Sequence, residues 1–354
     1  MKSIFISGMA GSGKTAIALG LALKLREAGI NVGYFKPLGT AKGPHRQEDE
    51  DVLLFQDVLS LKHEASLLCP VRTGPYYLSG GPHRDPDKSA AVIKEAYATV
   101  SDGLDLVLID GSLSPYTAAS LGLDAISLSK MLQAAMIHVI RMEDDYSLDK
   151  AIYYNEHFRL AGLNLLGSIF NNIERTLLDK TKGVYAPIME KLGLPILGII
   201  PRKAEIAAPT VLEFYDALGG ELLTGEEVGM NRMVEEVVVG SMTIESALGY
   251  LRRAPNKAVI TGGDRSDMAV TALETSTSVL ILTGGLYPDV GVLTRAIEKN
   301  VPVILVHYDT YTAIERLHVV SRRIRPGDED GIKVAKDNVS AHCNVQPIIN
   351  FVEQ

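Results

Sequence analysis

An eight-residue segment near the N-terminus combines glycines, a lysine and a threonine in a spacing suited to phosphate binding. It runs from Gly8 to Thr15 and reads GMAGSGKT. Because it lies between an apolar run and a helical pattern, its backbone N–H groups can turn toward an anion at the helix start. In such a loop Lys14 reaches the β and γ phosphates of a nucleotide, and Thr15 ligates magnesium. The residues predicted to cradle the phosphates are Gly8, Gly11, Ser12, Gly13, Lys14 and Thr15.

The alternative to this prediction is a glycine-rich turn that only caps the helix. A carboxylate at the right place favours the functional interpretation. Asp110 ends the apolar run Leu106 to Ile109 and is followed by Gly111. An aspartate in this position can hold magnesium directly or through water. Taken alone, it could equally be an ordinary turn residue.

Two further charged features lie between these motifs. The cluster Glu48 to Asp51 precedes an amphipathic pattern from Val52 to Leu61. Acidic side chains stabilise a helix N-terminus, so capping explains most of the cluster, although Asp51 or Asp49 could be a second metal ligand. Lys36 follows the apolar run Val32 to Phe35 and lies at the edge where open α/β sheets bind ligands.

The elements that must position these residues follow an alternating pattern. Short apolar runs alternate with helical patterns over the first 225 residues, which predicts an α/β fold with a parallel sheet covered by helices on both faces. The expected helix Thr15 to Ala28 is closed by Gly29. The expected strands are Ser3 to Ile6, Val32 to Phe35, Leu106 to Ile109, Ile137 to Ile140, Leu166 to Phe170 and Ile196 to Ile200.

A second and smaller α/β series follows the glycine-rich, acidic stretch Gly219 to Gly229, which we interpret as a linker. We therefore expect domains at 1–225 and 226–325, followed by a mobile charged connection and a short C-terminal segment at 326–354. The expected strands of the second domain are Glu236 to Val239, Ala258 to Thr261, Val279 to Leu282 and Val303 to Val306. Its expected helices are Ile244 to Arg253, Ser266 to Thr275, Val290 to Lys299 and Tyr311 to Arg323.

The composition excludes several classes of protein. The 354 residues are 46% hydrophobic and carry a formal net charge of -8, without the positive field that nucleic acid or an anionic membrane requires. No apolar run is long enough to span a bilayer, and the first 15 residues do not resemble a signal peptide. The two cysteines, Cys69 and Cys343, cannot form a disulfide framework. We expect a cytoplasmic protein with neither a nucleic-acid nor a membrane partner.

The order of the motifs resembles that of the dethiobiotin synthetase-like P-loop family. The phosphate loop is followed by KPLGT (Lys36 to Thr40), an acidic pair, Asp110-Gly111, Asn171-Asn172 and GIIP (Gly198 to Pro201). This family includes cobyrinic acid a,c-diamide synthase and the regulatory N-terminal domain of long phosphotransacetylases, and the resemblance covers about residues 1–225.

The resemblance implies ATP and Mg²⁺ as cofactors and assigns roles to several residues. Lys36 and Thr40 would face the γ phosphate or an acyl phosphate, and Asp51 and Asp110 would hold the metal. The adenine would meet Asn171 or Asn172 together with Pro201. Proteins that resemble this domain often build their substrate pocket across a dimer interface, so a homo-oligomer is also expected.

The second domain resembles a DRTGG domain. The resemblance rests on two loops that each follow an apolar run, Thr261 to Asp267 and Leu282 to Gly285. Their backbone N–H groups and Arg265 could bind an anion, as could His307 and Asp309 after the last strand. They could equally form tight turns, with Asp264 as a cap and Arg265 in an ion pair. The candidate ligand residues are Gly263, Asp264, Arg265, Thr283, Gly284 and Gly285.

Two functions are compatible with these features. The first is a nucleotide-dependent regulatory or adaptor module of central or cofactor metabolism, which the second domain favours and which acts on a partner enzyme. The alternative is an ATP-dependent ligase of dethiobiotin synthetase or cobyrinic acid a,c-diamide synthase type, which acts on a small carboxylate or amine metabolite. It would activate a carboxylate or carbamate by γ-phosphoryl transfer, with Lys14, Lys36 and Thr40 as catalytic residues. Dethiobiotin synthetase loops are typically one residue longer and rich in threonine, and this difference favours the regulatory module.

Overall fold

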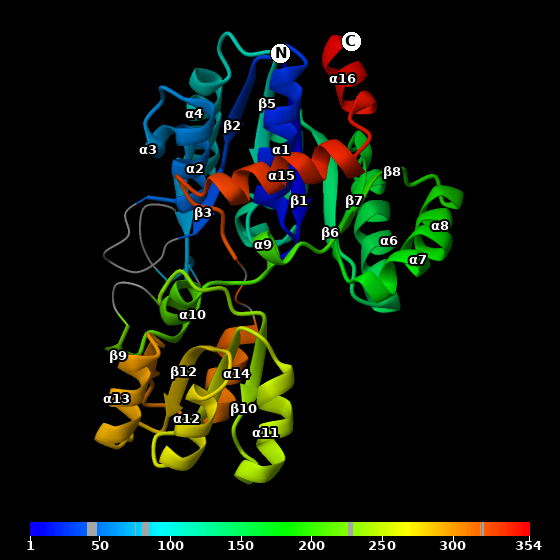
Figure 1. The fold of residues 1–354 in the computed structure, drawn as a ribbon. Coiled ribbons are helices and arrows are strands. Elements are labelled where there is room, and N and C mark those ends of the chain that lie inside the picture. Colours follow the sequence, from blue (N-terminus) through cyan, green and yellow to red (C-terminus); the bar gives the residue numbers. More distant parts are fainter. Residues whose placement is uncertain (41–47, 75, 80–84, 226–228, 319, 321) are drawn as a thin grey trace. The chain divides into compact units, whose positions relative to one another are not determined.

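The computed structural model divides into two compact units (Figure 1). It describes residues 1–40, 48–74, 76–79, 85–225, 229–318, 320 and 322–354. The first unit contains residues 1–203 and 324–354, and the second contains residues 204–323. The first unit is therefore discontinuous in sequence.

The first unit is built on a six-stranded sheet in which every paired strand is parallel. The spatial order is β2-β5-β1-β6-β7-β8, so the strand that precedes the phosphate loop lies between β5 and β6. All six expected strands are present, and the expected fold class is confirmed. Their bounds are β1 (Lys2–Gly8), β2 (Val32–Phe35), β5 (Leu106–Asp110), β6 (Ala135–Arg141), β7 (Leu165–Ile173) and β8 (Ile196–Pro201).

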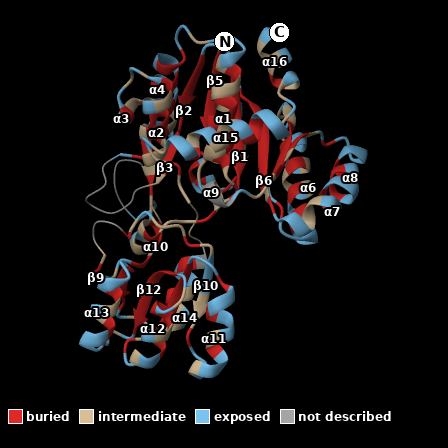
Figure 2. Cartoon of the chain, viewed as in Figure 1, coloured by how far each residue is buried: buried red, intermediate tan, exposed pale blue. Residues whose placement is uncertain are grey.

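Consecutive apolar residues in these strands are buried because both faces of the sheet are covered. Every residue of β2 and β5 is buried, and Figure 2 shows the strands as a buried layer among helices whose outer faces are exposed. After β2 the chain contributes to a separate two-stranded parallel sheet, which consists of β3 (Leu38–Thr40) and β4 (Val71–Thr73). Strands of three residues are too short to leave a periodic sequence pattern.

The helices of the first unit include two that belong to the C-terminal part of the chain. The prediction of a mobile connection after residue 325 is wrong from Glu329 onward. This part of the chain forms the helix α15 (Glu329–His342), which packs against α1 (Lys14–Glu27). Gly20 permits a close approach, since a Cβ there would overlap the carbonyl oxygen of Ala335 and a methyl group of Val339. The helices are α1 (Lys14–Glu27), α2 (Glu50–Leu59), α3 (Ala65–Leu68), α4 (Pro86–Val100), α5 (Ala125–Met131), α6 (Asp145–Leu160), α7 (Leu178–Lys180), α8 (Ala186–Lys191), α15 (Glu329–His342) and α16 (Gln346–Glu353).

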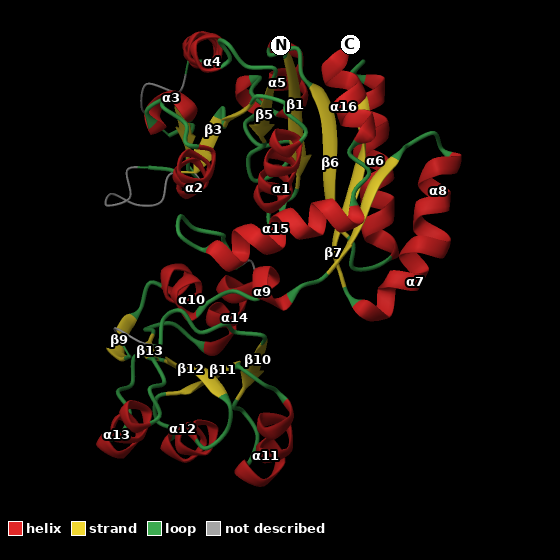
Figure 3. Cartoon of the chain, turned by 45° about the horizontal axis from the view of Figure 1, so that its top comes forward, coloured by secondary structure: helices red, strands yellow, loops and turns green. Residues whose placement is uncertain are grey.

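The second unit contains a mixed five-stranded sheet in the order β10-β11-β12-β13-β9. Four strands are parallel, and β9 pairs antiparallel with β13 at one edge. Figure 3 shows the helices packed around this sheet. The strands are β9 (Glu221–Thr224), β10 (Glu236–Val239), β11 (Lys257–Gly262), β12 (Thr277–Thr283) and β13 (Val303–Leu305). The helices are α9 (Ala204–Ala207), α10 (Val211–Leu218), α11 (Ile244–Arg253), α12 (Ser266–Leu273), α13 (Val290–Glu298) and α14 (Thr310–His318).

The boundaries between the units differ from those expected. The segment Gly219 to Gly229, interpreted as a linker, contains β9, whose pairing with β13 places it in the second unit; residues 226–228 of that segment lie outside the described residues. The helix expected from Tyr311 to Arg323 is observed as α14 from Thr310 to His318, and positions 319 and 321 are likewise not described. Across the described ranges, none of the helices is both long and apolar enough to cross a membrane.

Candidate functional site

The candidate residues of the first unit follow strands whose carboxyl ends share one edge of the parallel sheet. Lys36 follows β2, Asp110 ends β5, the phosphate loop follows β1, and Asn171 lies near the end of β7. Since β2, β5, β1, β6 and β7 are successive neighbours, the topology brings these residues to the same edge. Open α/β sheets bind their ligands at this edge.

The phosphate loop has the backbone shape that its glycines permit. Gly11 and Gly13 adopt φ angles of 74° and 86°, in the left-handed region that favours glycine. A Cβ at Gly8 would overlap the carbonyl oxygen of Val139 on β6. Lys14 begins α1 directly after this turn, so the first N–H groups of the helix adjoin the loop. Such an arrangement is suited to a phosphate anion.

Four side chains lie close together around the start of α1: Lys14, Thr15, Tyr34 and Asp110. The ammonium group of Lys14 donates to the carbonyl oxygen of Met9 at 3.0 Å, and burial lowers the pKa of this lysine to about 8. The hydroxyl of Thr15 donates to Oδ2 of Asp110 at 3.3 Å. The hydroxyl of Tyr34 donates to the same oxygen at 3.0 Å, and burial raises the pKa of the Asp110 carboxyl above its usual range.

Several buried polar atoms of this region make no hydrogen bond with the described residues. They are the hydroxyl oxygens of Ser7, Ser12 and Ser112 and the Oδ1 atom of Asp110. A buried polar atom without a partner costs free energy, so such atoms gathered at one site call for a ligand. Oxygen atoms from Thr15 and Asp110 form a donor set that Mg²⁺ accepts. The residues present thus fit a magnesium-bound phosphate group.

Lys36 lies in a buried cluster of charges. Its ammonium group donates to Oδ1 of Asp49 at 2.9 Å and also contacts the carboxylate of Asp51. Burial disfavours the charged form, but Asp51, Asp110 and Asp49 outweigh it and raise the pKa of Lys36. Asp49 also accepts the N–H of Thr40 at 3.3 Å and caps α2 by accepting the N–H of Asp51 at 3.0 Å. The structure thus brings Lys36, Asp49 and Asp51 together and ties Thr40 to them through its backbone.

The residues expected near the adenine lie at the ends of β7 and β8. The amide nitrogen of Asn171 donates to the carbonyl oxygen of Ser12 at 2.8 Å, which places Asn171 against the phosphate loop itself. Asn172 follows with a φ angle of 56°. Pro201 ends β8 and pairs with Ile173. A role for Asn172 and Pro201 in base binding stays a prediction.

Two residues beside the site were not identified from the sequence. Tyr34 is fully buried, stacks on Phe55 with 3.7 Å between ring centroids, and binds Asp110. Arg141 ends β6, and its guanidinium lies 3.9 Å from the position that a Cβ of Gly11 would occupy. It also pairs with Glu143 at 2.9 Å. The only available signal was their position at the ends of predicted strands, which many residues without a role share.

The loops of the second unit do not offer the free N–H groups that we expected. The N–H groups of Gly263, Gly284 and Gly285 donate to the carbonyl oxygens of Thr283, Tyr308 and Val306. The expectation is wrong because these bonds connect the loops to neighbouring strand ends and so satisfy the backbone inside the fold.

The side chains of these loops also have partners within the second unit. Arg265 forms an ion pair with Asp267 at 3.0 Å, as expected if these loops are tight turns rather than anion-binding loops. Thr283 is buried and bonds to Thr310, whereas Asp264 is exposed and does not cap α12. Asp309 caps α14 through Thr312, and His307 is exposed.

Comparison with known proteins agrees with the geometry of the first unit. The AAA domain family AAA_26 matches residues 2–210, more than half of the chain. The chain belongs to the AAA_26 family. The DRTGG domain family matches residues 213–320, which nearly coincides with the second unit. An AAA domain followed by a DRTGG domain is therefore the organisation of this chain.

Phosphate acetyltransferases and dethiobiotin synthetases are among the relatives of this chain that have a curated description. Phosphate acetyltransferases from Pseudomonas putida and Nitrosomonas europaea are 25% and 24% identical, over 94% and 99% of this chain. The chain spans about half of their length, 49% and 51%. The ATP-dependent dethiobiotin synthetase of Methanocaldococcus jannaschii is 27% identical over 57% of this chain and 95% of its own length.

Solved structures show weaker similarity. The septum site-determining protein MinD of Pyrococcus horikoshii, complexed with Mg-ADP, is 20% identical, covers 58% of this chain and 83% of its own, and has a TM-score of 0.35. The CBS and DRTGG domains of the Clostridium perfringens pyrophosphatase regulatory region, complexed with diadenosine tetraphosphate, are 18% identical. They cover 48% of this chain and 85% of their own, with a TM-score of 0.29.

Proposed function

We propose that the chain binds Mg-ATP in its AAA domain and acts as a nucleotide-dependent regulatory module of a metabolic enzyme. The observation that carries this proposal is the set of unpartnered buried atoms, among the described residues, around the phosphate loop: Ser12 Oγ and Asp110 Oδ1 beside Lys14 and Thr15. Lys14, Thr15 and the loop N–H groups would hold the phosphates. Thr15, Asp110 and Asp51 would hold magnesium, which neutralises phosphate charge when bound.

The contacts of Lys36 support a switch. Asp51 is a candidate metal ligand and is also a partner of Lys36. The occupied and empty states of the nucleotide site would therefore differ in the partners of Lys36. A regulatory module requires such a difference between two states, because a ligand shifts an equilibrium only by its differential affinity. The similarity to half of each phosphate acetyltransferase agrees with a module that serves a larger activity.

A second candidate function is an ATP-dependent ligase that activates a carboxylate or carbamate by γ-phosphoryl transfer. It is favoured by the burial of Lys36 beside Asp49 and Asp51 at the ligand-binding edge. Once free of the carboxylates, the ammonium group could neutralise charge developing on a transferred phosphoryl group. Similarity to nearly the whole of a dethiobiotin synthetase supports the same alternative.

The deciding experiment measures ATP binding and phosphate release by the same protein preparation. Binding of Mg-ATP is measured by calorimetry, and release is followed with and without a panel of small carboxylates and amines. Lys14→Ala removes the phosphate-facing ammonium group. Lys24→Ala is the matched control, because Lys24 lies on the same helix and is 37% exposed.

The regulatory module predicts that ATP binds, that Lys14→Ala weakens binding about tenfold or more, and that phosphate release stays slow with every panel member. Lys24→Ala should bind as the unaltered chain does. Release that accelerates with one metabolite class would instead identify the ligase. If ATP does not bind the unaltered chain, or binds Lys14→Ala equally well, both functions are rejected.

A further inference from the structure

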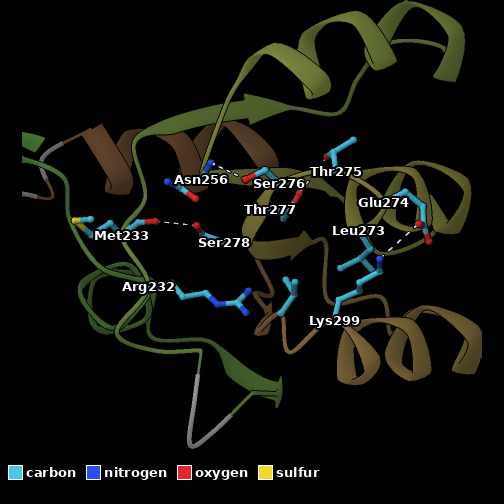
Figure 4. Close-up of a pocket in the computed structure, with 11 residues that line it drawn as sticks. Arg232, Met233, Asn256, Leu273, Glu274, Thr275, Ser276, Thr277, Ser278 and Lys299 are labelled. Carbon is cyan, nitrogen blue, oxygen red and sulfur yellow. Dashed lines mark hydrogen bonds and ion pairs between the residues drawn. The ribbon is translucent and has the colours of Figure 1, made fainter.

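The second unit contains a polar cavity that is separate from the loops Thr261 to Asp267 and Leu282 to Gly285, here called the DRTGG loops. Its volume is about 400 Å³, and its lining includes Arg232, Asn256, Glu274, Ser276, Ser278 and Lys299 (Figure 4). It lies where β11 and β12 begin, whereas the DRTGG loops follow the carboxyl ends of the same strands. A cavity of this size can hold a small metabolite.

The cavity is positively charged within an acidic chain. The guanidinium of Arg232 makes no hydrogen bond or ion pair with the described part of the chain. The one acidic residue of the lining, Glu274, accepts from Arg295 at 2.6 and 2.9 Å, and Arg295 also pairs with Glu298 at 2.7 Å. Lys299 forms an ion pair with the same carboxylate at 3.8 Å, which Figure 4 marks with a dashed line. The two cations of the lining, Arg232 and Lys299, thus outnumber its one acidic residue, and Arg232 is the cation without an acidic partner among the described residues.

One wall of the cavity is fixed by a buried lysine. Lys257 is fully buried, and its ammonium group donates to the carbonyl oxygens of Ser276 at 2.7 Å and Ala254 at 3.2 Å. The hydroxyl oxygen of Ser276 accepts the N–H of Asn256 at 3.2 Å, and Figure 4 shows these two residues side by side. No bond to the described residues uses the hydroxyl hydrogen of Ser276. This hydrogen is available to a ligand.

A bulge places the neighbouring residue in the same lining. Lys257 pairs with Thr277 but Ala258 pairs with Val279, so Ser278 is an extra residue in β12. Its hydroxyl donates to the carbonyl oxygen of Met233 at 2.7 Å, which fixes the segment that carries Arg232. Bulges re-aim side chains and are frequent beside binding sites.

We propose that this cavity is a binding site for a small phosphorylated metabolite. Arg232, Lys299 and Ser276 come from three different segments, and Figure 4 shows Arg232 and Lys299 entering from separate elements. Donors from three segments suit the several oxygens of a tetrahedral phosphoryl group, and a guanidinium can contact two of them at once. The site is independent of the proposed nucleotide site, since all of its residues belong to the second unit.

The experiment uses the full chain carrying Lys14→Ala, so that phosphate binding at the phosphate loop does not interfere. Calorimetry without magnesium measures binding of inorganic phosphate, pyrophosphate and, as a carboxylate probe, citrate. Arg232→Gln and Lys299→Gln are each added to this background. Arg252→Gln is the matched control, because Arg252 is exposed on α11 and outside the cavity.

We expect a phosphate probe to bind saturably, and each cavity variant to weaken this binding about 10- to 150-fold. The control should bind normally. In the unaltered chain, pyrophosphate should shift the backbone amide NMR signals of Asn256, Ser276 and Lys299. The proposal is overturned if neither phosphate probe binds, if the cavity variants bind as the control does, if those amide signals do not move, or if citrate binds more tightly than pyrophosphate.

Discussion

The side-chain amide of Asn171 donates to the carbonyl oxygen of Ser12 at 2.8 Å across 159 positions of the sequence. This bond joins the end of β7 to the loop that begins α1. A Cβ at Gly13 would overlap the same amide nitrogen. Gly13 is therefore required twice, for its left-handed backbone and for the space that Asn171 occupies.

Substitution of Gly13 should separate these two requirements. Gly13→Ala should reduce ATP affinity about tenfold or more, because the added methyl group displaces Asn171 and the loop carbonyl that it holds. Gly103→Ala is the matched control, since Gly103 has a φ angle of 70° but no atom within 4 Å of its Cβ position. It should cost about 1 kcal/mol of stability and leave ATP binding unchanged. Equal affinities of the two variants in calorimetry would show that the Asn171 contact has no role.

Buried His138 should make the first unit sensitive to acid. Burial lowers the pKa of His138 to about 4, and its Nδ1 lies 2.9 Å from the side-chain oxygen of Asn155. Between pH 6.5 and pH 4 the imidazole of His138 is protonated in the unfolded chain but not in the folded chain. Stability from this residue is thus complete above pH 6.5 and is lost as the pH falls toward 4, by about 3 kcal/mol.

His138→Gln should reduce that pH dependence. Its free energy of unfolding, measured in urea from pH 7.5 to 4.5, should change less with pH than that of the unaltered chain. His157→Gln, on the exposed side of α6, should retain the full dependence. If the two variants have the same pH dependence, His138 is not the residue responsible.

The buried cluster around Lys36 should be sensitive to the loss of its cation. Lys36→Met would remove the cation that buried Asp49 and partly buried Asp51 share, at a cost of about 3 to 5 kcal/mol in the free energy of unfolding. Adding Asp49→Asn should recover part of the loss because it removes one of the two negative charges that Lys36 balances. Lys24→Met breaks an exposed pair with Glu27 and should cost less than about 1 kcal/mol. Equal midpoints of urea unfolding for Lys36→Met and Lys24→Met would show that the contacts of Lys36 with the two carboxylates do not stabilise the fold.

Replacement of glycine by alanine should have opposite effects on stability at Gly20, where α1 contacts α15, and at Gly249 in α11. Gly20→Ala should destabilise the first unit by about 1 to 3 kcal/mol, because its methyl group overlaps the backbone of Ala335. Gly249→Ala in α11 adds a methyl group in open space and should stabilise the second unit by about 0.5 to 1 kcal/mol. Scanning calorimetry would detect both shifts, and a stabilising Gly20→Ala would show that the two helices are not in close contact.

The sequence was sufficient to predict the parallel sheet because its strands are short, continuously apolar runs separated by helical patterns. It also placed the phosphate loop and Asp110 at the correct strand ends. The C-terminal helix α15 was missed because its sequence is charged and its apolar positions are few, so packing against α1 rather than propensity stabilises it. The strand β9 was missed because four residues between glycines carry no clear period.

Hydrogen-bond partners could not be predicted because they depend on three-dimensional geometry. The glycine N–H groups of the DRTGG loops looked available in the sequence, but neighbouring strand ends accept all three. Lys36 was expected to face phosphate, and the structure pairs it with Asp49 and Asp51, which the sequence suggested as helix-capping residues or metal ligands. Motif spacing identifies where such residues gather, and the folded chain determines which of them pair.

The discontinuity of the first unit has a consequence for synthesis on the ribosome. The helix that covers Gly20 is encoded after residues 204–323, so α1 and the phosphate loop emerge long before α15. The second unit is contiguous and can fold as soon as it is released. The region around α1 and the phosphate loop would then be among the last parts of this chain to reach final stability, although it is nearly the first part to be made.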